Sequence, residues 1–316
     1  MRQLAKAAWV VICIGNANVD VYPDSDEEFF GGSAANTAVR LADLAMEGEI
    51  GSADPIQVHL LAAVGTDARG ESIVEQLTTR GVCTDYLFRI RGESQQSGIT
   101  LGETGDREIS RGERKVVELG NRVHELYQQG FFSMGPAGNL LPTFLNPPIP
   151  WVHVKAQVPV LQAAAQEGIW IGSLDLGSIE NADDWMMLTP QLQVSVLSGN
   201  EEEVARAGGI EALWANPAVE FICIKQGSRG ATLELRNELE FLLDPFPVDA
   251  VDTTGAGDAF NAGIIWGILH RWTLGEIGLL ACALGALTCT ERGAQNPPVT
   301  YIGLRDIGYS MPWGRR

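Results

Sequence analysis

The sequence is poor in the residues that build disulfide frameworks and metal clusters. Its 316 residues include only five cysteines, an odd number without a Cys-x-x-Cys pair, and four histidines scattered along the chain. We therefore expect reduced thiols, a cytoplasmic location and no histidine-based metal centre. The histidines expected to be structural or surface residues are His59, His124, His153 and His270.

Basic residues and long apolar runs are also scarce. Lysine and arginine number 22 against 40 aspartates and glutamates, a formal net charge of -18 at pH 7. Nucleic acids and anionic membranes are bound through clustered positive charge, so neither is expected as a partner. No apolar run reaches the ~18 residues that span a bilayer. The N-terminus is similar to a weak signal peptide, but the short, β-branched run 9–14 favours a buried strand.

Short apolar segments alternate with helical stretches along most of the chain. Continuous apolar runs such as 9–14 and 192–199 are typical of strands covered on both faces. The segments 34–45 and 70–81 read as helices between such strands. The alternation predicts a three-layer α/β/α fold with a mostly parallel central sheet. We expect one domain over residues 1–316.

Residues 85–118 break this alternation. Polar and apolar residues alternate there, and glycine-containing turns separate the short segments. We predict two or three short strands outside the main sheet, which form part of a lid. Ser97 and Arg107 are candidate lid side chains. Arg107 could meet a substrate phosphate or carboxylate, although an exposed lid charge is the more ordinary role.

The sequence Asp-Thr-Thr-Gly-Ala-Gly-Asp (252–258) leads into an apolar helix. Gly255 and Gly257 permit positive φ and close backbone approach, so we expect the amides of residues 255–258 to point outward at the helix N-terminus. Such amides and the helix dipole bind anions such as phosphate. Neither a P-loop nor a dinucleotide-binding fingerprint is present. Asp258 could cap the helix or accept a hydroxyl proton during phosphoryl transfer.

A second polar constellation follows the first predicted strand. Asp20 and Asn36 offer a carboxylate and an amide, and Gly31 and Gly32 let the backbone come close. This set suits the adjacent hydroxyls of a polyol. A tight turn with helix caps is the alternative.

Two further turns carry candidate ligands. Asn200 and Glu203 lie at i and i+3 of a helix start. They could hold hydrated Mg²⁺ through oxygen ligands, or they could form a capping box. A glycine-containing turn joins two strands within 224–233.

Together these segments resemble the PfkB/ribokinase family of carbohydrate and nucleoside kinases. Residues 252–263 match the family's C-terminal signature without a departure, 31–36 match its Gly-Gly-x-x-x-Asn element, and 200–203 match its Asn-x-x-Glu motif. Order and spacing agree from about residue 9 to 300. The resemblance implies a Rossmann-like, ribokinase-like fold with a small β lid, and ATP-dependent phosphorylation of a sugar-like alcohol.

The resemblance also implies a role for each matching residue, with ATP and Mg²⁺ as cofactors and K⁺ as the candidate monovalent cation. The assignments are the catalytic base Asp258; the anion hole Gly255, Ala256 and Gly257; the substrate contacts Asp20, Gly31, Gly32 and Asn36; the Mg²⁺–phosphate motif Asn200 and Glu203; the nucleotide turn Lys225, Gly227 and Gly230; and the monovalent-cation position Asp252 and Thr254.

One departure concerns the segment between Asp20 and Gly31. Only ten residues separate them, where ribokinase has a longer lid segment. We therefore expect the first lid hairpin to be nearly absent and the substrate pocket to be open enough for a bulky or modified sugar. The short segment is similar to the fructoselysine 6-kinase branch. It leaves open whether the chain forms the lid-to-lid homodimer of ribokinase.

Three other functions are alternatives to a sugar kinase. A nucleoside kinase would use the same chemistry. A catalytically silent family member would bind a sugar or nucleotide in a regulatory role, although the intact Asp258 and Gly-Ala-Gly argue against it. A nicotinamide-dependent oxidoreductase needs a glycine-rich fingerprint after the first strand, and the sequence lacks one there.

Overall fold

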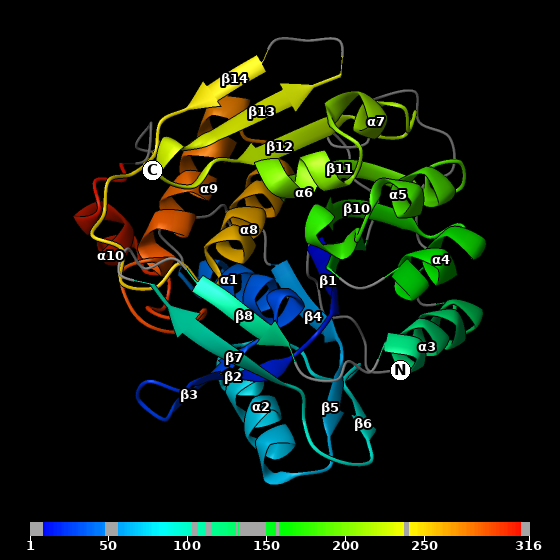
Figure 1. The fold of residues 1–316 in the computed structure, drawn as a ribbon, viewed down its shortest axis with the longest axis horizontal. Coiled ribbons are helices and arrows are strands. Elements are labelled where there is room, and N and C mark those ends of the chain that lie inside the picture. The colour runs from blue at the N-terminus through cyan, green and yellow to red at the C-terminus, as the bar shows by residue number, and fades with distance from the viewer. Residues whose placement is uncertain are drawn as a thin grey trace.

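The main sheet of the protein has eight strands in the order β14-β13-β12-β11-β10-β9-β1-β4 (Figure 1). Strands β12 to β4 run parallel, whereas β13 and β14 extend one edge antiparallel. The strands are β1 Trp9–Gly15, β4 Ile56–Leu61, β9 Trp151–Lys155, β10 Trp170–Asp175, β11 Gln193–Asn200, β12 Phe221–Lys225, β13 Ala231–Leu235 and β14 Glu240–Leu243. The computed structural model describes residues 9–47, 56–102, 107–111, 116–130, 132, 150–155, 158–236 and 240–310.

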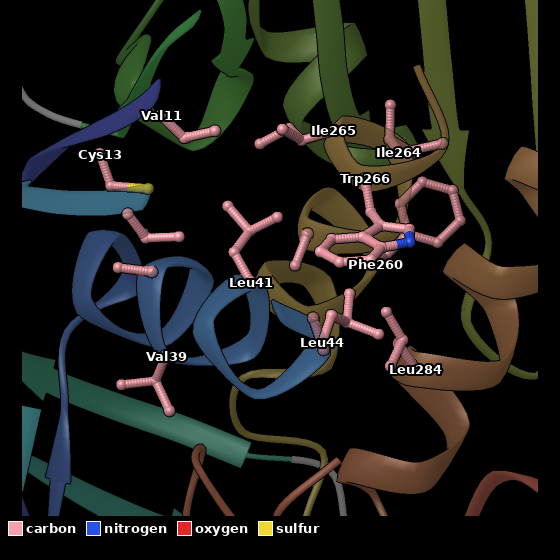
Figure 2. Packing of buried hydrophobic residues seen from close by; sticks show 14 of the residues in the cluster. Val11, Cys13, Val39, Leu41, Leu44, Phe260, Ile264, Ile265, Trp266 and Leu284 are labelled. Atoms are coloured by element: carbon pink, nitrogen blue, oxygen red, sulfur yellow. The ribbon is translucent and has the colours of Figure 1, made fainter. Parts of the chain in front are cut away.

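Helices cover both faces of this sheet, as the alternation of segments predicts. Along β1, Val11 and Cys13 belong to one buried cluster, and Ile12 and Ile14 belong to another. Figure 2 shows Val11 and Cys13 facing side chains of α1 and α8. The helices are α1 Ser33–Met46, α2 Ala68–Thr79, α3 Val116–Gln128, α4 Val158–Gln166, α5 Ala182–Leu188, α6 Glu201–Arg206, α7 Ile210–Trp214, α8 Ala256–Leu269, α9 Leu274–Thr288 and α10 Tyr301–Asp306.

A four-stranded lid sheet with the order β3-β2-β7-β8 lies outside the main sheet. Its strands are β2 Asn18–Tyr22, β3 Glu27–Gly31, β7 Gln96–Leu101 and β8 Arg107–Arg111. The prediction of a nearly absent first hairpin is wrong, because β2 and β3 pair over five residues each. The short segment between Asp20 and Gly31 leaves both strands intact and reduces the connection to the turn 23–26.

The predicted lid segment 85–118 is only partly lid. It supplies β7 and β8, but its first strand, β6 Phe88–Ile90, pairs with β5 Ala63–Gly65 in a separate two-stranded sheet. Its end already belongs to α3. The other two strands of the lid sheet come from the hairpin β2–β3. The strands β2 and β7, which pair in this sheet, therefore lie far apart in the sequence.

Two expectations from the composition concern unpaired thiols and the lack of membrane-spanning segments. All five cysteines are unpaired, and Cys13, Cys223 and Cys282 are buried. Across the described ranges, no helix combines the length and the apolar character that a membrane crossing requires.

Candidate active site

Charged side chains gather at the carboxyl edge of the main sheet, where the parallel strands end. Lys155, Asp175 and Lys225 are the last residues of β9, β10 and β12. Lys225 is the register partner of Asn200, which ends β11. Because parallel strands end at one edge, these residues meet although they lie far apart in the sequence. This edge is where open α/β sheets hold their ligands.

Asp175 is the centre of this charged group and is fully buried. Its Oδ1 lies 2.7 Å from Lys155 Nζ, and its Oδ2 lies 2.9 Å from Lys225 Nζ. Asn261 Nδ2, from α8, donates to Oδ2 at 2.7 Å. Burial alone would raise the pKa of Asp175, but the two ammonium groups outweigh it and hold that pKa well below its usual range. The edge is therefore a fixed, ionised framework.

The turn before α8 depends on Gly255. This residue is left-handed at φ 81°, and an added Cβ would lie 2.6 Å from the carbonyl oxygen of Ala294. The expectation that all amides of 255–258 point outward is wrong for Ala256, whose N–H donates to Thr253 O at 3.3 Å. The turn closes on itself through this bond, so the anion site has fewer amides than the sequence suggested.

Gly257 and Asp258 occupy the first turn of α8, where amides lack partners within the helix. An added Cβ on Gly257 would lie 3.3 Å from Lys225 Nζ, so an ammonium group borders these amides. Gly255 holds the N-cap position, and no side chain caps the helix. Asp258 is therefore not the cap that the sequence left as its alternative role.

The Asp258 carboxylate connects α8 with α1 and β9. Asn36 Nδ2 donates to its Oδ2 at 2.9 Å, and Lys155 Nζ lies 3.8 Å from its Oδ1. Asn36 Oδ1 in turn accepts from Gln295 Nε2 at 3.1 Å. Burial raises the pKa of Asp258, and Lys155 opposes that rise without cancelling it. The predicted base and one predicted substrate contact are thus in direct contact.

Asp20 lies on β2 and is buried in the lid sheet. Asn18 Nδ2 donates to its Oδ1 at 2.7 Å. An added Cβ on Gly31 would lie 2.0 Å from Asp20 Oδ2, and one on Gly32, at φ 99°, would lie 2.6 Å from Asn16 O. A side chain at either glycine would therefore clash with Asp20 or with the backbone of Asn16, so both positions require glycine.

The two candidate lid side chains can be placed on the lid strands. Ser97 is the register partner of Asp20, and its Oγ lies 3.3 Å from Asn18 Nδ2. Arg107 is the first residue of β8, and its side chain lies outside the described part of the chain.

Asn200 and Glu203 form a capping box at the start of α6. Glu203 N donates to Asn200 Oδ1 at 2.7 Å, and Asn200 N donates to Glu203 Oε2 at 2.9 Å. Glu203 Oε1 faces the space above Gly177. There an added Cβ would lie 2.8 Å from Oε1, 2.9 Å from Asp175 Oδ1 and 3.0 Å from Lys155 Nζ. The box therefore leaves one carboxylate oxygen directed at the charged edge.

The turn after Lys225 links β12 to β13. Gly227 has φ 60°, and an added Cβ there would face open space. Gly230 has φ 91°, and an added Cβ would lie 1.9 Å from Leu243 O, so glycine is required where the turn packs on β14. The turn lies at the same sheet edge as Asn200, the register partner of Lys225.

Asp252 is fully buried behind the turn of Gly255. Thr254 N donates to its Oδ1 at 2.8 Å, Gly293 N donates to its Oδ2 at 3.0 Å, and Tyr22 of the lid donates to Oδ2 through its hydroxyl. No lysine or arginine within the described ranges reaches ion-pair distance of this carboxylate. The carboxylate is thus held by neutral donors and links the lid to the turn.

Several residues of the candidate site were missed by reasoning from the sequence. Lys155 and Asp175 belong to no motif, although both end apolar strands with a charge, which was the available signal. Asn261 lies within the signature 252–263 but was given no role. Tyr22 and Gln295 were not singled out either, because nothing local marks a tyrosine or glutamine as a partner of Asp252 or Asn36.

The fold and the charged carboxyl edge define an α/β enzyme whose site lies beyond the strand ends. A sequence model of the pfkB family carbohydrate kinases matches residues 10–300, and the chain belongs to this family. It is a sugar kinase, and kinases of this family use ATP; the comparisons do not favour a catalytically silent relative.

Individual relatives agree with this assignment. The chain is 24% identical over 284 residues to fructosamine kinase from Bacillus subtilis, covering 90% of this chain and 92% of the relative. It is 25% identical over 286 residues to fructoselysine 6-kinase from Shigella flexneri, covering 89% and 97%. Arabidopsis thaliana ribokinase, solved with ribose and ATP, has the same fold with a TM-score of 0.63 and 20% identity, covering 96% of this chain and all of that one.

Proposed function

We propose that the chain transfers the γ-phosphoryl group of ATP to a hydroxyl of a glycated amine, a sugar joined to an amino compound. The observation that carries the proposal is the Asn36–Asp258 hydrogen bond of 2.9 Å, which joins the sugar-binding segment to the base. The similarity to fructosamine and fructoselysine kinases supports the substrate class.

Asp258 is the general base of this reaction. Asn36 occupies its Oδ2, so Oδ1 accepts the proton of the acceptor hydroxyl as the new oxygen–phosphorus bond forms. The bond between the γ-phosphorus and the bridging oxygen breaks, and ADP leaves. The amides of Gly257 and Asp258, bordered by the Lys225 ammonium, stabilise the charge on the transferring group.

Asn200 and Glu203 are proposed to hold Mg²⁺ through water. The support comes from Glu203 Oε1, which the capping box does not use and which faces the charged edge as an oxygen ligand for a water of hydrated Mg²⁺. When bound, Mg²⁺ neutralises part of the charge on the phosphates of ATP. The capping box fixes the position of the Glu203 carboxylate for this role.

Asp252 and Thr254 are proposed to hold a monovalent cation such as K⁺. A fully buried carboxylate with only neutral donors is costly, and a bound cation would compensate its charge. Asp252 Oδ1 accepts one bond from Thr254 N, which leaves a lone pair for a cation. Replacing K⁺ in the assay by a bulky organic cation should lower kcat, and unchanged turnover would contradict this site.

Lys225, Gly227 and Gly230 are proposed to form the nucleotide-binding turn. The open space at Gly227 lets a flat ligand approach the backbone, and Lys225 lies between this turn and the amides of α8. We also propose a reducing, cytoplasmic location, which the five unpaired thiols support.

A substrate screen tests the proposed function. ADP release is measured with Mg·ATP over free sugars, nucleosides and glycated amino acids, with Asp258→Asn as the inactive control. We expect the highest kcat/KM for a glycated amino acid. Higher kcat/KM for a nucleoside would overturn the substrate class, and equal ADP release by the control would overturn the site.

A further inference from the structure

Lys155 faces two carboxylates at the carboxyl edge. It ends β9, and its Nζ lies 2.7 Å from Asp175 Oδ1 and 3.8 Å from Asp258 Oδ1. Its side chain is 20% exposed, whereas that of Asp175 is fully buried. Of the ammonium and guanidinium groups in the described ranges, that of Lys155 alone lies within ion-pair distance of Asp258.

The position of this ammonium group distinguishes the two oxygens of Asp258. Asn36 donates to Oδ2, and Lys155 lies beside Oδ1. Oδ1 is the oxygen that the proposed reaction uses to accept a proton. A nearby positive charge favours the charged form of a carboxylate, so Lys155 acts on the reactive oxygen.

We propose that Lys155 is a positioning residue for phosphoryl transfer, which holds the Asp258 carboxylate charged and directed at the acceptor hydroxyl. The inference rests on the proposed role of Asp258 as the base. It gives Lys155 a second task beyond neutralising Asp175.

Other charged groups also face Asp258. Burial raises the pKa of Asp258; Lys155 is the strongest opposing influence, Asp175 on β10 raises it further, and Lys225 on β12 lowers it slightly. The charge of Asp258 also acts on Arg40 of α1, where it opposes the lowering of the Arg40 pKa by burial. Burial would lower the pKa of Lys155, but Asp175, Asp258 and Glu203 outweigh it and raise that pKa, so Lys155 stays charged.

A structural explanation competes with this proposal, because Lys155 could serve only to neutralise Asp175. Lys225 offers a matched control for that explanation. It lies at a similar distance from Asp175, 2.9 Å against 2.7 Å, but it makes no ion pair with Asp258. The two lysines therefore separate the effect on Asp175 from the effect on Asp258.

The experiment compares the pH dependence of kcat for Lys155→Met, Lys225→Met and Lys155→Arg. The base works when deprotonated, so activity falls as pH drops through its pKa. Removing the Lys155 charge raises that pKa, and we expect the acidic limb to move up by about 1–3 pH units. Lys155→Arg keeps the charge and should restore the wild-type limb. Lys225→Met should lower kcat and raise KM for ATP, because Lys225 borders the phosphate-binding amides, but it should move the acidic limb much less than Lys155→Met does.

Two results would overturn the inference. One is an unmoved acidic limb in Lys155→Met, and the other is an equal movement in Lys155→Met and Lys225→Met. Lys155→Gln is a second neutral variant that can still hydrogen-bond to Asp175, so the profile remains measurable if Lys155→Met unfolds. If Asp258→Asn keeps full turnover, the base assignment itself fails, which distinguishes that failure from an error about Lys155.

Discussion

The charged edge of the main sheet and the lid hairpin are both held by ion pairs, but in opposite surroundings. Asp175 is fully buried between Lys155 and Lys225. At the tip of the hairpin, Asp24 and Glu27 are 54% and 50% exposed and pair with Arg292, which follows α9 and is 30% exposed. Water and salt screen exposed pairs, whereas a buried charge that loses its partner is strongly destabilising.

The difference indicates how the two regions work. The edge, where Asp258 and Asp175 lie, holds the reacting groups in one arrangement. The tip of the hairpin β2–β3 is joined to Arg292 by contacts that break at little cost, whereas the buried Tyr22–Asp252 hydrogen bond holds strand β2 itself. The same type of interaction therefore contributes strongly to stability at the buried sheet edge and little at the exposed tip of the hairpin.

The largest expected effect comes from the edge. Asp258→Asn should lower kcat by about 10²-fold or more, because general-base catalysis contributes that much. Nucleotide affinity should stay within a few-fold, since Asp258 is assigned to the acceptor hydroxyl. Single-turnover kinetics and nucleotide titration measure the two quantities. Near-wild-type turnover would remove Asp258 from the base role.

Asp175→Asn should destabilise the charged edge of the main sheet. It leaves two largely buried ammonium groups without the carboxylate that they share, so the free energy of unfolding at pH 7 should fall by about 3–5 kcal/mol. The folded-state pKa of Asp175 is lowered, so its stabilisation exists above the unfolded value of ~3.9 and is lost as pH falls. Urea unfolding at several pH values checks both statements. The exposed Arg69→Gln is the control, and an equal loss there would contradict the comparison.

Asp20 tests the lid side of the site. Asp20→Ala should raise KM for the acceptor by about 10- to 150-fold, the equivalent of a hydrogen bond to a charged group worth roughly 1.5–3 kcal/mol. KM for ATP should hardly change, and a deoxy acceptor should show a smaller effect because it already lacks the partner. Calorimetric titration with both ligands is the measurement. Equal weakening for acceptor and ATP would mean that Asp20 holds the fold.

The smallest effect is expected for Arg292→Gln. Its pairs with Asp24 and Glu27 are exposed, so the Tm should not move measurably. Acceptor KM should rise by about two-fold, and 0.5 M salt should produce a similar rise in the wild type because it screens the same pairs. A large loss of Tm would show that these exposed pairs contribute to stability as the buried pairs of the charged edge do.

The sequence predicted the features that depend on local pattern. The parallel strands, the helices around them and the turn before α8 follow from apolar runs and glycine spacing. The contacts of Asp175 could not be predicted, because the order of strands in the sheet brings Lys155 and Lys225 to it. The prediction of a nearly absent first lid hairpin is wrong because a turn of a few residues is enough to connect two paired strands. The length of the segment alone does not show this.

One ambiguity of the sequence is resolved and one persists for a physical reason. Gly255 holds the cap position of α8, which excludes that role for Asp258. Asn200 and Glu203 form a capping box, yet Glu203 Oε1 still faces the edge. One pair of residues can therefore cap a helix and bind a ligand together, and no spacing rule separates the two roles.

The bonds of Arg40 have a consequence for how the protein is made. This fully buried side chain on α1 donates to the carbonyl oxygens of Ala294, Asn296 and Pro297, up to 257 positions later in the chain. Asn36 and Tyr22 likewise find their partners in Gln295 and Asp252. Contacts of such sequence separation form late, since long loops must close first. During translation, these bonds of Arg40 cannot form until residues 294–297 have been made, so α1 must wait for a segment more than 250 positions further along the chain.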